Sequence, residues 1–215
     1  MLADRYGNQL STSSAATRDL YIEAIDKLLG AAPDMQEAFE AVTISDPGFA
    51  LGHSGLARTR QIKGDIAGAR EAMAAARALA DGLNAKDAAH VNALTLLIEG
   101  RGAEAYSAIR SHVAEHPRDV LVAQTCTSVF GLIGFSGRPG REAELLAYTT
   151  TLQPHYGDDW WFVSQHAFSF CETGQLDRAD DLIEQSLAVN PRNAHGAHVR
   201  AHVYYEAGEA EAGMD

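Results

Sequence analysis

The sequence predicts an all-α protein built from repeated antiparallel helix hairpins. Alanine, the residue with the highest helix propensity, accounts for 38 of the 215 residues. The alternation of β-branched and aromatic residues that is typical of strands is nearly absent. Glycines recur at intervals of 34, 36, 34, 40 and 34 residues, at Gly30, Gly64, Gly100, Gly134, Gly174 and Gly208. A helix-forming composition and a fixed period together favour a stack of similar helical units.

The glycine period has the spacing of a known repeat architecture. Three of the glycines are followed after 17 residues by a proline, namely Pro47, Pro117 and Pro191. Glycine readily adopts the positive φ at which a helix ends, and proline ends a helix because it lacks the backbone N–H. A unit of about 34 residues with a central glycine and a terminal proline is typical of tetratricopeptide repeats. We therefore expect a right-handed superhelical solenoid, with a single repeat array over residues 1–215.

Each hairpin can be assigned from these glycines and prolines. Five complete hairpins are expected, over residues 14–46, 48–82, 84–116, 118–153 and 158–190, and the fourth includes a short insertion. Residues 193–207 are expected to form the first helix of a sixth, incomplete hairpin. Because repeat arrays normally end in a capping helix with a polar outer face, we expect the chain to be the N-terminal part of a longer protein. The apolar face around Val203, Tyr204 and Ala207 is then expected to mediate self-association.

Two further positions recur in the same register. A small residue is expected five positions after the central glycine, where two helices cross closely, and a larger apolar residue is expected four positions later. Met35 is the exception at the small position. The other residues that follow this pattern are Ala69, Ala105 and Ala179 at the crossing and Phe39, Met73, Ile109 and Ile183 at the apolar position.

Composition excludes several classes of partner. The chain carries 17 basic and 29 acidic residues, a net charge of −12, which disfavours a nucleic-acid or anionic-membrane surface. Cys126 and Cys171 are too few for a disulfide framework and indicate a reducing compartment. The first residues lack the apolar core of a signal peptide, and the longest apolar stretch, 129–135, is far shorter than the ~20 residues of a membrane-spanning helix. The sequence thus predicts a soluble cytoplasmic protein.

Three segments resemble one particular family as a set. They are Phe130-Gly-Leu-Ile-Gly-Phe-Ser-Gly-Arg-Pro-Gly-Arg141, His155-Tyr-Gly-Asp-Asp-Trp-Trp-Phe162 and Asn193-Ala-His-Gly-Ala-His-Val-Arg-Ala-His-Val-Tyr-Tyr-Glu206. Together with Asp4-Arg-Tyr-Gly-Asn8, they resemble the tetratricopeptide repeat protein 38 family over nearly the whole chain. The resemblance implies a helical solenoid and a longer protein, but no particular activity.

The first helix of each hairpin is expected to line the concave surface of the array, so its inward positions are the candidate binding residues. Three histidines in the sixth unit, spaced three and then four residues apart, share one helical face. The candidate groove residues are His195, His198, His202, Tyr205 and Glu206 in the sixth unit, Trp161, Ser164, Phe168, Cys171 and Glu172 in the fifth, Asp87 and His90 in the third, and Ser54 and Arg58 in the second.

A divalent transition metal is an alternative role for the histidine face. His195, His198 and His202, with Glu206 or an acid from a neighbouring helix, have the residue types that ligate zinc, iron or manganese. The segment lacks the glutamate that follows the first histidine in helical zinc peptidases, and histidines also pack between helices. A packing or partner-binding role is therefore favoured, and no cofactor is expected.

Other motifs are explained by local structure. Asp158 or Asp159 is expected to cap the following helix. The glycine-rich segment 131–140 lacks the preceding strand and the lysine-serine or lysine-threonine pair of a phosphate loop, so a long turn is expected. A weak anion site at Arg138 and Arg141 is the alternative. Cys171 is expected to be a buried small side chain rather than a nucleophile.

These observations favour a binding module over an enzyme. The groove of such a module is expected to hold a peptide, a protein segment or a small ligand, which is the usual role of helical solenoids. The alternative is an enzyme, or a small-ligand or metal-binding protein, with a histidine-rich pocket in the C-terminal repeats.

Overall fold

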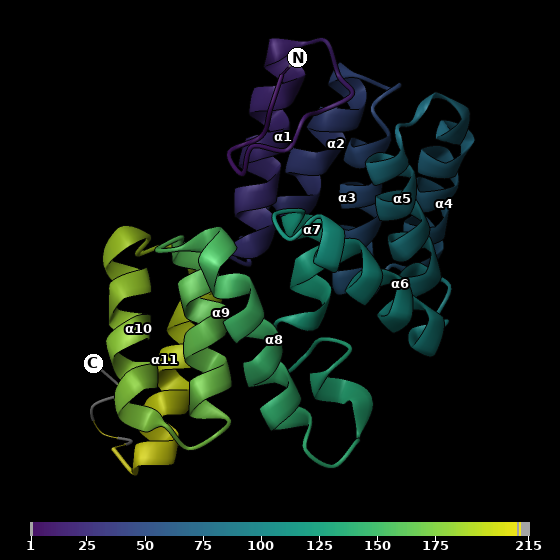
Figure 1. Cartoon of the computed structure of the whole chain (residues 1–215). Coiled ribbons are helices and arrows are strands. Elements are labelled where there is room, and N and C mark those ends of the chain that lie inside the picture. The colour runs from purple at the N-terminus through teal and green to yellow at the C-terminus, as the bar shows by residue number, and fades with distance from the viewer. Residues whose placement is uncertain (1, 210, 212–215) are drawn as a thin grey trace. The chain divides into compact units, whose positions relative to one another are not determined.

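The computed structural model describes residues 2–209 and 211, and these residues are overwhelmingly helical (Figure 1). They contain no β-strand, only an isolated antiparallel bridge between Ala3 and Gln9. The prediction of an all-α fold is therefore confirmed. The α-helices are α1 (Ala15–Leu29), α2 (Met35–Ser45), α3 (Ala50–Ile62), α4 (Ile66–Ala78), α5 (Ala85–Ile98), α6 (Gly102–Glu115), α7 (Val120–Ala123), α8 (Arg141–Tyr156), α9 (Trp160–Cys171), α10 (Leu176–Val189) and α11 (Ala194–Ala207).

The chain forms two compact units. Unit 1 comprises the residues up to Leu28 together with Pro33–Ala123, and unit 2 comprises Leu29–Ala32 together with the residues from Gln124 onward. Helices α1 to α7 therefore belong to unit 1, apart from the last residue of α1, and helices α8 to α11 belong to unit 2. The expectation of one array over residues 1–215 stays a prediction.

Unit 1 consists of helix hairpins at the predicted positions. Helix α3 packs against α4, its partner in the hairpin, and also against α2 and α5 of the adjoining hairpins (Figure 1). Helix α1 contacts α2 through Tyr21, whose ring meets Phe39 edge-on with centroids 6.1 Å apart. Helix α3, the first helix of its hairpin, thus contacts α5, the first helix of the next hairpin.

The central glycines follow helices as predicted, except Gly134, which begins a 3-10 turn. Gly64, Gly100, Gly174 and Gly208 follow α3, α5, α9 and α11, and their φ angles lie between 74° and 84°. Gly30 also follows its helix, but there the left-handed residue is Ala31, with φ 54°. An alanine pays a steric penalty in this region that glycine avoids.

The recurring small and apolar positions are buried. At the crossing position Ala69, Ala105 and Ala179 have no exposed surface, which lets the helix backbones approach closely. Met35, the exception to the small-residue pattern, is also buried. The apolar residues four positions later are also in the core, with exposed fractions of 0% for Phe39, Ile109 and Ile183 and 3% for Met73.

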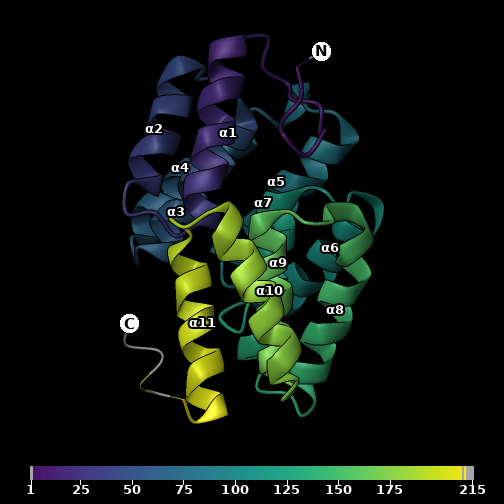
Figure 2. The ribbon, with the colours of Figure 1, turned by 90° about the vertical axis from the view of Figure 1, so that its left-hand side faces the viewer.

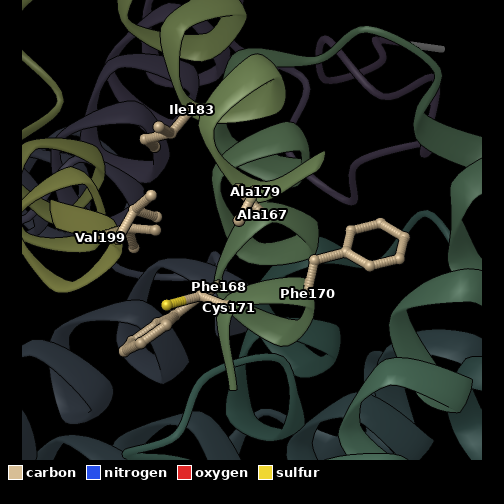
Figure 3. Close-up of a cluster of buried hydrophobic side chains, with 8 residues drawn as sticks. Ala167, Phe168, Phe170, Cys171, Ala179, Ile183 and Val199 are labelled. Atoms are coloured by element: carbon tan, nitrogen blue, oxygen red, sulfur yellow. The ribbon is translucent and has the colours of Figure 1, made fainter. Parts of the chain in front are cut away.

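Unit 2 is organised around α9, which packs against α8, α10 and α11 (Figure 2). Its core cluster joins the three helices α9, α10 and α11 through small and large apolar side chains. Figure 3 shows Ala167 and Ala179 together, with Phe168 and Val199 on one side of α9 and Phe170 pointing to another.

The face of α11 that is predicted to self-associate is partly covered in the structure. Val203 belongs to the core cluster and is 3% exposed, whereas Tyr204 is half-buried and Ala207 is exposed. Self-association through this face stays a prediction.

The fourth hairpin departs from the prediction in its first half. Its first helix ends early, at Ala123, and is followed by 3-10 turns at Gln124–Cys126 and Gly134–Ser136. A Cβ atom on Gly131 would lie 2.6 Å from the Thr125 carbonyl oxygen, and one on Gly134 would collide with the backbone of Val129. These glycines therefore permit close backbone contacts in a compact loop, in agreement with the long turn expected over 131–140.

The second helix of the fourth hairpin also differs, because α8 runs through Pro154 instead of ending at residue 153. Proline removes one helical hydrogen bond. The last turn is nevertheless held by buried Leu152 and by Tyr156, whose ring stacks on Phe162 with centroids 5.1 Å apart. Tertiary packing thus outweighs the local preference of the proline.

Candidate functional site

Unit 1 contains a buried cluster of ionisable side chains centred on Asp119. Three elements position it: His90 lies in the middle of α5, His112 lies in the last turn of α6, and Asp119 stands just before α7. The turn after α6 is closed by the Asp119 N–H, which donates to the His116 carbonyl at 3.0 Å, and the Asp119 carbonyl accepts from the Ala123 N–H at 2.9 Å. The backbone around Asp119 is therefore fixed from both sides.

Both histidines donate to the Asp119 carboxylate. His90 Nδ1 lies 2.9 Å from Oδ2 and 3.1 Å from Oδ1, and His112 Nε2 lies 2.9 Å from Oδ2. The side chains of His90, His112 and Asp119 are 0%, 1% and 6% exposed. The opposite ring nitrogens, His90 Nε2 and His112 Nδ1, are buried and have no hydrogen-bond partner in the described part of the chain.

A lysine and a second carboxylate complete the cluster. Lys86 Nζ lies 3.5 Å from Asp119 Oδ2 and 3.3 Å from Asp87 Oδ1, and Asp87 is fully buried. Asp87 is held by Asn84, the N-cap of α5, whose side-chain oxygen accepts from the Asp87 N–H at 2.9 Å. Lys86 is 18% exposed, so its ammonium stands at the edge of the cluster.

The electrostatics of the cluster follow from burial and close opposite charges. Burial alone would raise the pKa of Asp119. The electrostatic attraction and hydrogen bond of His90, the hydrogen bond from His112 and the charge of Lys86 outweigh burial, and the pKa of Asp119 lies well below its usual range. Burial would lower the pKa of Lys86, whereas Asp119 and Asp87 together raise it. Burial raises the pKa of Tyr21 well above its usual value. The negative charges of Asp119, Asp4 and Asp87 raise this pKa further, so the electrostatic potential around Tyr21 is negative.

Sequence reasoning found only part of this cluster. Asp87 and His90 were expected on the inner face of the third hairpin, whereas His112, Asp119 and Lys86 were not expected at a site. An aspartate two residues after a hairpin-ending proline is typical of a helix N-cap, so its local pattern gives no signal of a shared site. His90 is buried, and it faces this cluster rather than an open groove.

In unit 2 the structure brings the three α11 histidines together around one aromatic ring. The Phe168 ring centroid lies 6.2 Å from that of His195, 6.3 Å from that of His198 and 5.1 Å from that of His202. The rings of His198 and His202 are 4.6 Å apart. Burial, aided by the charge of His198, lowers the pKa of His195 to about 4, and burial with the charge of His202 lowers that of His198.

The predicted groove residues differ in exposure. Trp161, Ser164 and Phe168 of α9 are buried, as is Cys171, whose pKa burial raises to about 11, so its thiol is not activated. Glu172 and His202 are half-buried. The candidates with exposed surface are His198, Tyr205 and Glu206. The Asp159 carboxylate accepts from the Phe162 N–H at 3.2 Å, which confirms the expected cap of α9.

A surface hollow lies beside the 127–140 loop. It has a volume of about 280 Å³, and its lining includes Phe135 of the loop, Arg141, Glu142 and Leu145 of α8, and Glu172 after α9. Arg141 Nε lies 3.0 Å from Glu142 Oε1. Since Arg138 is likewise paired with Glu144, at 2.7 Å, both arginines already have carboxylate partners, which disfavours the anion site.

The loop connects this hollow with the α11 histidines. The Phe130 ring lies 5.8 Å from that of Phe135 and 5.9 Å from that of His198. Phe135 is 73% exposed and Phe130 is 53% exposed. We call Phe130, Phe135, Glu142, Glu172, His198 and His202 together the loop–histidine surface.

The grouping of metal-ligand residues differs from the alternative that the sequence left open. Within the described residues, one group of histidine, cysteine, aspartate or glutamate side chains converges closely enough to share a metal ion. It consists of His90, His112 and Asp119, whose ligand atoms lie within 4.8 Å of one another. His195, His198, His202 and Glu206 do not form such a group there.

None of the helices in the described part of the chain combines the length and apolar character that crossing a bilayer requires. A comparison of the chain with known protein families found no family that matches it.

Proposed function

We propose that this chain is a binding module of tetratricopeptide-type hairpins, related to the tetratricopeptide repeat protein 38 family, in which the hairpins form a right-handed superhelical solenoid. Its support is the recurrence of helix, glycine, helix and proline at a period near 34 residues, together with the buried alanines at the helix crossings. Solenoids of this kind commonly bind extended segments of other proteins. The proposed ligand is a protein segment that docks on the loop–histidine surface.

The observation that carries this proposal is the exposure of two neighbouring phenylalanines beside a hollow. Phe130 and Phe135 are more than half exposed and lie in contact with each other, next to a space of about 280 Å³. Exposed aromatic groups at the rim of a concavity are typical of interaction sites. An apolar side chain of the partner would fill the hollow against Phe135 and Leu145.

Charge narrows the class of partner. The lining of the hollow includes Glu142 and Glu172, whereas Arg141, the basic residue among the described lining residues, is paired with Glu142. Burial raises the pKa of Glu172, so its carboxylate is incompletely stabilised in the free protein. A cation close to Glu172 would stabilise the ionised form. The surface therefore fits a peptide with an apolar side chain next to a lysine or arginine.

A library of short random peptides selected on the whole chain tests this proposal. The selected peptides should combine an aromatic or aliphatic residue with a basic one, and they should bind Phe135→Ala and Glu172→Gln at least about tenfold more weakly. Val189→Ala, which truncates a 63% exposed apolar residue on α10, is the matched control and should bind normally. Failure to select any peptide, or equal binding to Phe135→Ala and the unaltered chain, would contradict the proposal.

A further inference from the structure

We infer that His90, His112 and Asp119 form a binding site for one divalent transition-metal ion, with two imidazole nitrogens and one carboxylate as ligands. The inference concerns side chains of unit 1 and is independent of the peptide-binding proposal, which concerns unit 2.

The spacing of the ligand atoms fits a metal ion with little movement. Zinc lies about 2.0–2.2 Å from imidazole nitrogens and carboxylate oxygens, so two ligand atoms on one tetrahedral ion are about 3.3–3.6 Å apart. His90 Nδ1 and His112 Nε2 each lie 2.9 Å from Asp119 Oδ2. The two nitrogens are within 4.8 Å of each other, so small rotations of the rings would bring them to ligand spacing.

The ligands are already held in place by the fold. They come from α5, α6 and the turn before α7, and their side chains are almost fully buried. A buried ligand set that is oriented before the ion arrives loses little conformational entropy on binding. The site is thus organised in the free protein.

The ring nitrogens also permit the required proton arrangement. In the free protein the nitrogens that face Asp119 carry the protons, because an ionised carboxylate only accepts hydrogen bonds. On metal binding those nitrogens must offer lone pairs, and the proton of each neutral ring moves to the opposite nitrogen. Among the described residues, His90 Nε2 and His112 Nδ1 have no hydrogen-bond partner, so no donor there opposes this change of tautomer.

The local charge favours a cation. Asp87 and Asp119 place two negative charges in the cluster against one positive charge on Lys86, at N–O distances of 3.3 and 3.5 Å. With neutral imidazoles the cluster carries a net negative charge in a buried environment. A divalent ion compensates this charge, while Lys86, at the partly exposed edge, can turn toward solvent as the ion enters.

The donor set indicates the class of metal. Imidazole ligands suit zinc, iron, cobalt, nickel and copper, whereas magnesium and calcium prefer oxygen ligands alone. Two histidines and one carboxylate leave a coordination position open for water or a small ligand. We therefore expect Zn²⁺ and Co²⁺ to bind and Mg²⁺ not to compete.

Metal titration of the whole chain, produced without a histidine tag and stripped with a chelator, tests the inference. Zn²⁺ should bind with one ion per chain in calorimetry, and Co²⁺ should give a visible absorption band that Zn²⁺ abolishes. Asp119→Asn and His112→Gln should each weaken Zn²⁺ binding at least roughly 100-fold. His53→Gln, which replaces a histidine on α3 outside the cluster, is the matched control and should bind normally.

Hydrogen exchange of the unaltered chain keeps the inference testable if the cluster variants do not fold. Zn²⁺ should slow exchange in α5, in α6 and in the turn before α7. Absence of stoichiometric binding would overturn the inference. It would equally be overturned if folded Asp119→Asn and His112→Gln bound Zn²⁺ normally, or if the protection appeared in α11 instead.

Discussion

The stability of unit 2 is expected to fall steeply between neutral and mildly acidic pH, because two of its histidines are held neutral. Burial, with a smaller contribution from the charge of Arg178, lowers the pKa of His166 from 6.5 to about 4. His166 is 8% exposed, its ring lies between those of Phe162 and Phe170, and its Nδ1 is 2.9 Å from Thr149 Oγ1. An imidazolium at this position would be poorly solvated.

The sign and size of the effect follow from proton linkage. The unfolded chain takes up a proton at His166 below pH 6.5, whereas the folded chain does so only near pH 4. The contribution of the neutral ring is therefore complete above pH 6.5 and is lost as the pH falls toward 4. At about 1.4 kcal/mol per pH unit, one such histidine lowers the free energy of unfolding by about 2 kcal/mol at pH 5 and by about 3.4 kcal/mol below pH 4. His195, whose pKa is also about 4, adds a comparable loss.

Urea unfolding followed by tryptophan fluorescence measures this loss in unit 2 alone. Both tryptophans of the chain, Trp160 and Trp161, lie in α9. His166→Asn retains a polar group near Nδ1 but cannot take up a proton, so it should remove about 2 kcal/mol of the decrease between pH 7 and pH 5. Thr149→Val is the matched control: it removes the hydrogen-bond partner but leaves the imidazole, so it should lower stability at every pH.

An unchanged pH dependence in His166→Asn would refute this reasoning, since it would mean that His166 takes up its proton equally in the folded and unfolded states. The same conclusion would follow if nuclear magnetic resonance showed the His166 ring titrating near pH 6.5 in the folded protein.

Three further substitutions test the fold and the proposed surface. Asp159→Ala removes the N-cap of α9 and should lower the free energy of unfolding of unit 2 by about 1 kcal/mol in the tryptophan assay; no change would mean that the observed hydrogen bond is not stabilising. Ile109→Ala opens a cavity at a fully buried position of α6 and should lower the free energy of unfolding by about 2–5 kcal/mol. Urea unfolding followed by far-ultraviolet circular dichroism measures this change, and a loss below about 1 kcal/mol would argue against the packing of α6. His198→Ala changes an exposed residue, so stability should stay within about 0.5 kcal/mol while binding of the selected peptides decreases; a large loss of stability would instead identify His198 as a packing residue.

The helices and their order are determined by short-range features of the sequence. Glycines at helix ends, prolines after helices and caps such as Asp159 act on the backbone of the next few residues, so their effects can be predicted without knowledge of the fold. The predicted hairpin 84–116, for example, corresponds to α5 and α6, which begin and end within two residues of its limits. The α11 histidines share a face because the helical period alone places them there.

The features that the sequence did not predict depend on contacts between elements. Helix α8 continues through Pro154 because Tyr156 stacks on Phe162 of the next helix. The burial of Trp161, predicted to line a groove, likewise depends on tertiary packing and not on its position in the helix.

The Asp119 cluster is the strongest example of what only the tertiary structure decided. His90 is 29 residues from Asp119 and His112 is 7 residues from it, and each residue lies on a different element. Local patterns identify a helix end, a helix face and a capping position, but they carry no information about which side chains converge. The convergence arises because α5 and α6 pack as a hairpin and the turn after α6 returns Asp119 to their interface. Side-chain chemistry at a site depends on distances in space, and these are set by long-range packing rather than by local backbone preference.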